Sequence, residues 1–110
     1  MAKANLINVV ATECAAGKEE FFNKWYNETH IPMLMKYKGI KKVTRYKLTG
    51  EVQGQAKYLA IYEFADKQTM DHMHHTKEFA AAMEEMQGTW KGDNFLKWAA
   101  PYEPIKSWEQ

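Results

Sequence analysis

Short blocks of apolar residues, separated by glycines and polar residues, divide the chain into segments of strand or helix length. Residues 5–12 are rich in Ile and Val, which predicts a strand. Apolar side chains then recur at helical spacing over 21–29, behind acidic residues that suit a helix N-terminus, so we expect a helix with one buried face. Pro32 disfavours helical geometry at the residue before it, so this helix should end or break near His30, and Gly39 should close a further turn.

The next part of the pattern predicts a hairpin and then a helix in two segments. The runs 40–49 and 57–65 are rich in β-branched and aromatic residues and flank a loop with glycines. Asp66 is a favourable N-cap for the following helix, and we expect a break before Thr76, which caps a second segment. The apolar stripe of that segment and the glycine expected at its end are Phe79, Met83, Met86 and Gly88.

A last strand at 94–100, followed by a tail at 101–110, completes the order β-α-β-β-α-β. This order is the split βαβ arrangement. The sequence therefore predicts an α+β, ferredoxin-like fold whose four-stranded antiparallel sheet carries both helices on one face. A chain of 110 residues has room for one domain, assigned to 1–110 with its core at about 5–100.

Both faces of the predicted sheet are apolar, which indicates how the protein assembles. In the run 57–65, one side carries Tyr58, Ala60, Tyr62 and Phe64, and the other carries Leu59 and Ile61. A sheet face exposed to water normally carries polar residues. The two helices cover only one side, so a second copy is expected to cover the other through a two-fold interface. The sequence thus predicts a homodimer that forms a dimeric α/β barrel.

The balance of charged residues and the residue types on the third strand argue against some classes of binding partner. The chain has 15 Lys and Arg against 14 Asp and Glu, which argues against a dedicated nucleic-acid or membrane-surface binder. In an RNA-recognition domain the third strand carries stacking aromatics, whereas the corresponding residues here are Leu59 and Ile61. Cys14 is the only cysteine, and the sequence shows neither a signal peptide nor an apolar run of membrane-spanning length. We therefore expect a cytoplasmic protein without an internal disulfide.

One stretch of the sequence carries a family resemblance. It holds Trp25, His30 and Pro32 in the spacing Trp-x(4)-His-x-Pro, and Gly39 follows. With Arg45-Tyr46 and the run 58–64, this stretch resembles the EthD-like branch of the dimeric α/β-barrel superfamily. In those proteins such a segment closes the first helix and a glycine opens the second strand.

The resemblance implies a ligand site between the sheet and the helices of each protomer. It also implies a range of activities, because the superfamily includes cofactor-free lactone isomerases, polyketide cyclases, quinone-forming monooxygenases and haem-degrading enzymes. It contains proteins without known activity as well. No residue of this sequence selects one of these chemistries.

His30 is the main candidate for catalysis, because an imidazole titrates near neutrality and acts as general acid or base without a cofactor. The alternative is that it caps backbone carbonyls at a helix end. Asn8 interrupts an apolar strand, and its amide either binds a ligand carbonyl or satisfies a neighbouring backbone group. Trp25 and Trp98 are expected to exclude water from the cleft.

Three further residues on the predicted strands are candidates for substrate binding. Tyr46 and Tyr62 can line a pocket and donate phenolic hydrogen bonds, or serve packing only. Arg45 can anchor a carboxylate or an enolate. Because strand residues alternate in direction, at most one of Arg45 and Tyr46 should face a given cleft.

A histidine cluster at His72, His74 and His75 is the segment most similar to a metal or haem site. Transition-metal sites usually need three or four converging ligands, and no such set is evident nearby, so we expect neither metal nor cofactor. The alternative is a polar helix face near a break. The lysines around 36–47 are likewise interpreted as a solvated edge.

These observations predict a cofactor-independent enzyme that catalyses proton transfer, as isomerisation or cyclisation, on a small enolisable or aromatic, polyketide-like molecule. His30 would move the proton, while Asn8 and a tyrosine would orient a carbonyl group. Two alternatives remain open: a non-catalytic ligand-binding or accessory protein, and a haem-degrading type of oxygenase.

Overall fold

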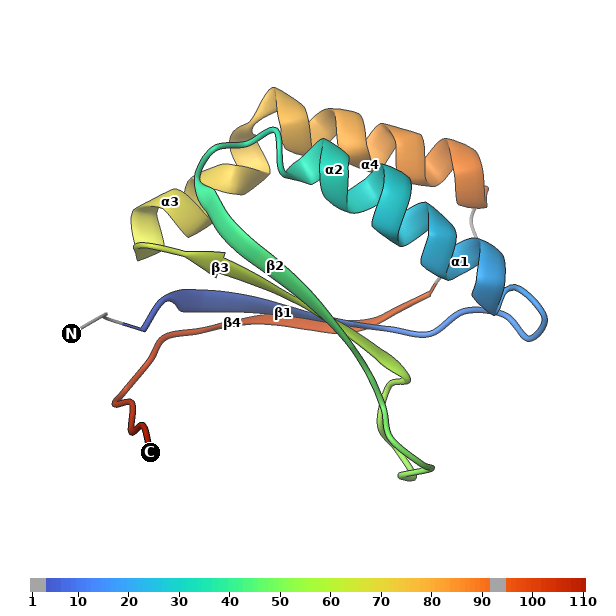
Figure 1. Cartoon of the computed structure of the whole chain (residues 1–110). Coiled ribbons are helices and arrows are strands. Elements are labelled where there is room, and N and C mark those ends of the chain that lie inside the picture. Colours follow the sequence, from blue (N-terminus) through green and yellow to red (C-terminus); the bar gives the residue numbers. More distant parts are fainter. Residues whose placement is uncertain (1–3, 92–94) are drawn as a thin grey trace.

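The computed structural model describes residues 4–91 and 95–110, in which four strands form one sheet in the order β2-β3-β1-β4. The strands are β1 (Leu6–Thr12), β2 (Ile40–Lys47), β3 (Tyr58–Phe64) and β4 (Leu96–Tyr102). Each neighbouring pair is antiparallel. The helices lie on one face of the sheet (Figure 1). The predicted ferredoxin-like β-α-β-β-α-β fold is therefore confirmed.

The first helical region runs through Pro32 without ending. Helix α1 (Glu19–Trp25) continues as a π-helical turn (Tyr26–His30) and then as α2 (Ile31–Leu34). The N–H group of Ile31 donates to the carbonyl of Tyr26, and Ile31 keeps helical angles although it precedes a proline. The expected end or break near His30 is therefore wrong. The helix takes one extra residue in its π-helical turn, and this wider turn accommodates Pro32, which has no backbone N–H to donate to the helix.

The second helical region is divided as predicted. Asp66 caps α3 (Lys67–His72) by accepting a hydrogen bond from the Thr69 N–H at 2.7 Å. A 3-10 turn (Met73–His75) follows, and Thr76 caps α4 (Lys77–Trp90) through the Phe79 N–H at 3.1 Å.

The end of α4 lies beyond the position predicted for it. Gly88 does not end the helix, which continues to the buried Trp90 and ends at Lys91, a residue with a left-handed φ of 48°. Burial of the Trp90 ring outweighs the weak helix preference of the glycine.

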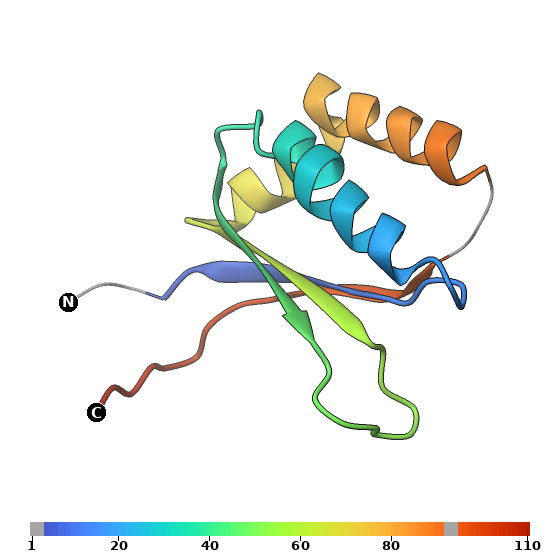
Figure 2. The ribbon, with the colours of Figure 1, turned by 45° about the vertical axis from the view of Figure 1, so that its right-hand side comes forward.

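Strand β4 is longer at its C-terminal end than the predicted strand 94–100, whose first residue lies outside the described residues. It includes Pro101 and Tyr102, which the sequence pattern places in the tail. β4 is an edge strand, which is where sheets tolerate proline. The tail that follows is exposed and leads away from the sheet (Figure 2).

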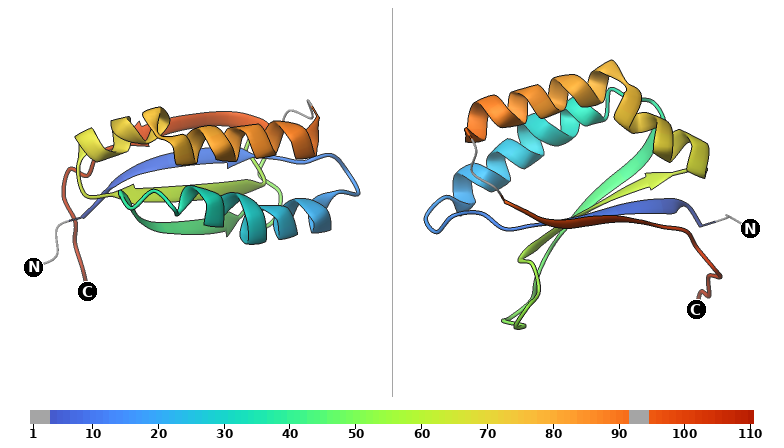
Figure 3. Two further views of the ribbon diagram at one scale, coloured as in Figure 1. Left: turned by 90° about the horizontal axis from the view of Figure 1, so that it is seen from above. Right: turned by 180° about the vertical axis from the view of Figure 1, so that it is seen from behind.

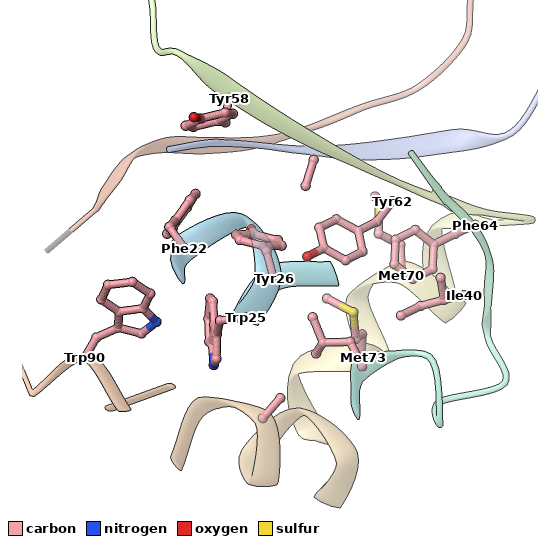
Figure 4. Close-up of a cluster of buried hydrophobic side chains, with 13 residues drawn as sticks. Phe22, Trp25, Tyr26, Ile40, Tyr58, Tyr62, Phe64, Met70, Met73 and Trp90 are labelled. Atoms are coloured by element: carbon pink, nitrogen blue, oxygen red, sulfur yellow. The ribbon is translucent and has the colours of Figure 1, made fainter. Parts of the chain in front are cut away.

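The core lies between the sheet and the helices, and much of it is aromatic (Figure 4). In β3, Tyr58, Ala60, Tyr62 and Phe64 are buried on this side. The Phe22 ring from α1 lies among aromatic rings of three other elements or loops, with centroids 5.2 Å from Phe95, 5.5 Å from Tyr58 and 5.6 Å from Trp90.

The opposite side of the sheet, here called the open face, has no helix over it among the described elements (Figure 3). Leu59 and Ile61 of β3 lie on it and are half-buried. Tyr46, Trp98 and Tyr102 also lie on it by strand register and are 52%, 42% and 52% exposed. The described residues include no helix long and apolar enough to cross a membrane.

Candidate functional site

A pocket of about 440 Å³ lies between the sheet and the helices. Its floor comes from β1, β3 and β4, and its roof from the π-helical turn, α2 and α4. Most of its wall is apolar, and the larger apolar side chains in it are Leu34, Met73, Phe79, Met83, Met86 and Phe95. The stripe predicted on α4 thus faces this space. A volume of this size suits a small organic molecule.

Four polar side chains meet at one part of this pocket, and we call them the polar cluster: Asn8, Tyr26, His30 and Tyr62. Asn8 and Tyr62 are cross-strand partners in β1 and β3, so both side chains lie on the helix side of the sheet. The hydroxyl groups of Tyr26 and Tyr62 are hydrogen-bonded to each other. The rings of Tyr26 and His30 are 5.1 Å apart in an edge-to-face arrangement.

His30 is buried in this cluster and held by aromatic rings. Its ring stacks on that of Trp25 at 4.6 Å, and its Nδ1 atom has no hydrogen-bond partner among the described residues. Burial lowers the pKa of His30 to about 4, while Glu85 acts to raise it and Arg45 to lower it further. The imidazole is therefore neutral at pH 7. The Nδ1 atom therefore caps no backbone carbonyl of the described residues.

Trp25 supports His30 from behind. It is buried, and its indole N–H donates to Glu85 of α4 at 2.8 Å, which fixes the face on which the imidazole stacks. Trp25 does not line the pocket, and neither does Arg45. The two tyrosines of the cluster stay protonated, because burial raises the pKa of Tyr26 and raises that of Tyr62 well above its ordinary value.

Arg45 does not line the pocket but contacts one of its residues, Tyr26. Its guanidinium lies 4.4 Å from the centre of the Tyr26 ring and donates to the Asn27 side chain at 2.8 Å. Arg45 and Tyr46 face opposite sides of the sheet, as the alternation of strand residues requires. An arginine in this position acts on a pocket ligand by its field rather than by contact.

Two residues expected to bind substrate lie on the wrong face of the sheet for this pocket. Tyr46 is opposite Leu59, and Trp98 is opposite Ala11, so both side chains belong to the open face. Cross-strand partners share a face. The candidate residues that the structure brings together in the pocket are thus Asn8, His30 and Tyr62.

The histidine cluster contributes one pocket residue. His74 lines the pocket, with its ring 4.8 Å from that of Phe79, whereas His72 and His75 do not line it. Among residues 4–91 and 95–110, no three His, Cys, Asp or Glu side chains are placed to hold a metal ion.

Sequence reasoning missed several polar pocket residues, of which Tyr26 is the most important. A usable signal existed, because Tyr26 precedes His30 by four residues and such pairs share a helix face. Thr12, Gln87 and Trp90 also line the pocket and had no comparable signal.

Burial of His30 predicts an acid-sensitive fold. The unfolded chain protonates this imidazole near its ordinary pKa of 6.5, and the folded chain only near a pKa of about 4. The folded state therefore binds fewer protons between these pH values, and the free energy of unfolding falls as the pH falls through this window, by at most about 3 kcal/mol. Urea unfolding at pH 7 and pH 4 measures this loss. His30→Gln should reduce it, and an unchanged pH dependence in the variant would contradict the assignment.

Solved structures with the same fold cover nearly the whole chain. An EthD family protein from Bacillus halodurans C-125 has a TM-score of 0.69 and 17% identity, over 91% of this chain and 99% of that chain. A DABB family protein with a ferredoxin-like fold from Mesorhizobium loti MAFF303099 has a TM-score of 0.70 and 10% identity, over 94% and 100%. A dimeric protein of unknown function and ferredoxin-like fold from Bacteroides fragilis NCTC 9343 has a TM-score of 0.61 and 10% identity, over 92% and 95%.

At these identities the likeness concerns the fold alone, and it agrees with the ferredoxin-like fold expected from the sequence. No curated protein matches the sequence. The sequence pattern of one family matches residues 5–100, nearly the whole chain. The chain therefore belongs to the family described as "Domain of unknown function (DUF4286)".

Proposed function

We propose that this protein binds a small enolisable molecule in the pocket and transfers a proton at the carbon next to its carbonyl group, without a cofactor. One observation carries the proposal: a buried, neutral imidazole with an unpartnered Nδ1 atom lies beside hydrogen-bonding groups in a largely apolar pocket. A general base and donors for the carbonyl oxygen are the groups that this reaction requires.

The polar cluster supplies both roles. His30 accepts the proton as the C–H bond breaks, and the electron pair passes to the carbonyl oxygen as an enolate. The amide of Asn8 donates to that oxygen. Since the Tyr26 and Tyr62 hydroxyls are bonded to each other, one of the two O–H groups is left to donate as well. The guanidinium of Arg45 behind the Tyr26 ring adds a positive field that favours the enolate.

Solvent deuterium exchange tests this function without knowledge of the natural substrate. The probe is 2-tetralone, a bicyclic ketone with acidic protons next to its carbonyl, incubated in deuterium oxide and followed by proton NMR. We expect the protein to accelerate loss of these proton signals over buffer and over heat-denatured protein. Exchange at the buffer rate, with 2-tetralone shown to be bound, would reject proton transfer.

A non-catalytic binding role is the second candidate, and the pKa of His30 favours it. An imidazole with a pKa of about 4 is a weak base at neutral pH. The same pocket would then hold a ligand without changing it. Binding of 2-tetralone without exchange is the result that this candidate predicts.

We further propose that two copies pair through the open face as a homodimer. The aromatic side chains Tyr46, Trp98 and Tyr102 are exposed on it around Leu59 and Ile61, and the Bacteroides fragilis neighbour is described as dimeric. An exposed patch of this kind is typical of an interface.

Sedimentation equilibrium at micromolar concentration should give the mass of two chains. Ile61→Asp, which places a charge on the open face, should give one chain, whereas Lys47→Asp, at an exposed position on the helix side of β2 opposite Tyr58, should not. A monomeric wild type would contradict the proposal.

A further inference from the structure

We infer that the pocket selects an electrically neutral, amphipathic ligand, whose single hydrogen-bonding end enters first and whose apolar body lies toward the mouth. This inference names the substrate class for the site of the proposed function and rests on that site. Three properties of the pocket support it: the charge of the wall, the burial of its polar groups, and the apolar side chains that make up most of the rest of the wall.

Among the described residues, the wall holds no permanently charged side chain, and its two histidines are the buried, neutral His30 and the exposed His74. Among the described residues that line the pocket there is no Asp, Glu, Lys or Arg. The guanidinium of Arg45 does not line the pocket; it lies behind the Tyr26 ring and is hydrogen-bonded to Asn27. A carboxylate or ammonium group placed beside the buried Tyr26, His30 and Tyr62 would therefore lose its water without gaining a contacting counter-charge, which is strongly unfavourable.

Three members of the polar cluster lie at the closed end of the pocket, and the fourth, Asn8, is half-buried beside Tyr62. Tyr26, His30 and Tyr62 are 2%, 5% and 2% exposed. In contrast, the pocket residues His74, Gln87 and Leu96 are exposed, which places the mouth on their side, between α4 and β4. A ligand that satisfies the buried groups must therefore bring its hydrogen-bonding end to the inner part of the pocket.

The polar cluster offers several hydrogen-bonding groups to a ligand. The Nδ1 atom of His30 is buried without a partner in the part of the chain that the structure describes, and the amide of Asn8 lies beside the hydroxyl pair of the tyrosines. An unsatisfied buried polar atom is unfavourable, so a ligand oxygen that pairs with these groups gains specificity as well as affinity. One carbonyl or hydroxyl group is the fitting partner, because a charged group is excluded by the wall.

Most of the remaining wall is apolar and suits a flat or flexible apolar body, although it also holds the indole N–H of Trp90, which has no hydrogen-bond partner among the described residues. Met73, Met83 and Met86 are unbranched and polarisable, and Phe79 and Phe95 add aromatic surface. Methionine side chains adapt to irregular ligands. The pocket therefore distinguishes ligands by their charge and by the position of one polar group more than by their exact shape.

A matched pair of probes tests the inference by binding alone. 2-Acetylnaphthalene and 2-naphthoate share a ring system and differ by a methyl group against a carboxylate oxygen. Isothermal titration at pH 7.5 should give at least about tenfold tighter binding of the ketone, since 1.4 kcal/mol corresponds to a factor of ten. Equal or tighter binding of 2-naphthoate would overturn the inference, and so would failure of the ketone to bind to folded protein.

Two asparagine variants test where the polar end lies. Asn8→Leu removes the half-buried amide beside Tyr62 and should weaken binding of 2-acetylnaphthalene by about three- to tenfold. Asn5→Leu makes the same change just before β1, where the amide bonds Glu63 outside the pocket, and should leave binding unchanged. Circular dichroism confirms folding, and Asn8→Ser replaces Asn8→Leu if the latter does not fold. Equal binding by the Asn8 and Asn5 variants would contradict the proposed orientation.

The binding and deuterium-exchange experiments together show whether the ligand class or proton transfer fails. Preference for the ketone without deuterium exchange would support the ligand class and reject proton transfer. Deuterium exchange together with tight binding of the carboxylate would do the reverse.

Discussion

Replacing His30 with alanine is expected to lower the rate of deuterium exchange into 2-tetralone by about 10²- to 10⁴-fold, the usual contribution of a positioned general base. His30 is the pocket residue with a buried neutral imidazole and an unpartnered nitrogen. NMR of the ketone in deuterium oxide measures the rate, and titration of the ketone separately measures binding. Loss of exchange with binding retained identifies a base rather than a packing residue.

His75→Ala is the matched control. His75 lies outside the pocket on the same histidine cluster, so its loss should leave exchange within about twofold of the wild type. The wild-type rate should also fall as the pH drops through about 4, where His30 becomes protonated. Exchange that survives in His30→Ala, or that titrates near neutrality, would remove His30 from the mechanism.

Replacing Phe22 with alanine is expected to lower the free energy of unfolding by about 3–5 kcal/mol. Its side chain is 0% exposed and joins α1 to the sheet and to α4. Ring centroids within 5.2–6.4 Å of it belong to Trp25, Tyr26, Tyr58, Trp90 and Phe95. Deleting the ring leaves a cavity beside two residues that support His30. Urea unfolding monitored by circular dichroism gives the loss.

Phe21→Ala controls for the general effect of removing a phenylalanine from this helix. Phe21 is 53% exposed, although its ring lies 5.1 Å from that of Trp90. We expect a loss within about 1 kcal/mol. Similar losses for the two variants would show that Phe22 does not hold the core together.

The order of elements could be predicted because local patterns and tertiary packing agree along most of the chain. In β3, alternate burial of Tyr58, Ala60, Tyr62 and Phe64 follows the spacing of the sequence. The caps at Asp66 and Thr76 are local hydrogen bonds within three residues, so no distant contact decides them. Such features depend on neighbours in sequence.

The predictions that failed were those in which packing outweighs a local rule. Pro32 should end a helix, but a π-helical turn preserves the path that buries Trp25, Tyr26 and His30. Gly88 should end α4, but the helix continues so that Trp90 is buried. Helix propensity is a weak preference beside the burial of an aromatic ring.

The site was partly predictable for the same reason. Asn8 and His30 are polar residues within apolar patterns, and Tyr62 follows the alternation of a strand, so sequence alone identified them. The face on which Trp98 lies depends on the pairing of β4 with β1, which shifts register between Ala11 and Thr12. Such a register is set by two distant segments, and no local signal reveals it.

The most direct test of the account is where a neutral ketone binds. In a titration of isotope-labelled protein with 2-tetralone followed by NMR, the largest shifts should fall on pocket residues such as Asn8, Val10 and Tyr62, with the His30 ring among them. Leu59 and Ile61 on the open face should shift least. Largest shifts on the open face, or no saturable shifts in the pocket, would contradict the account.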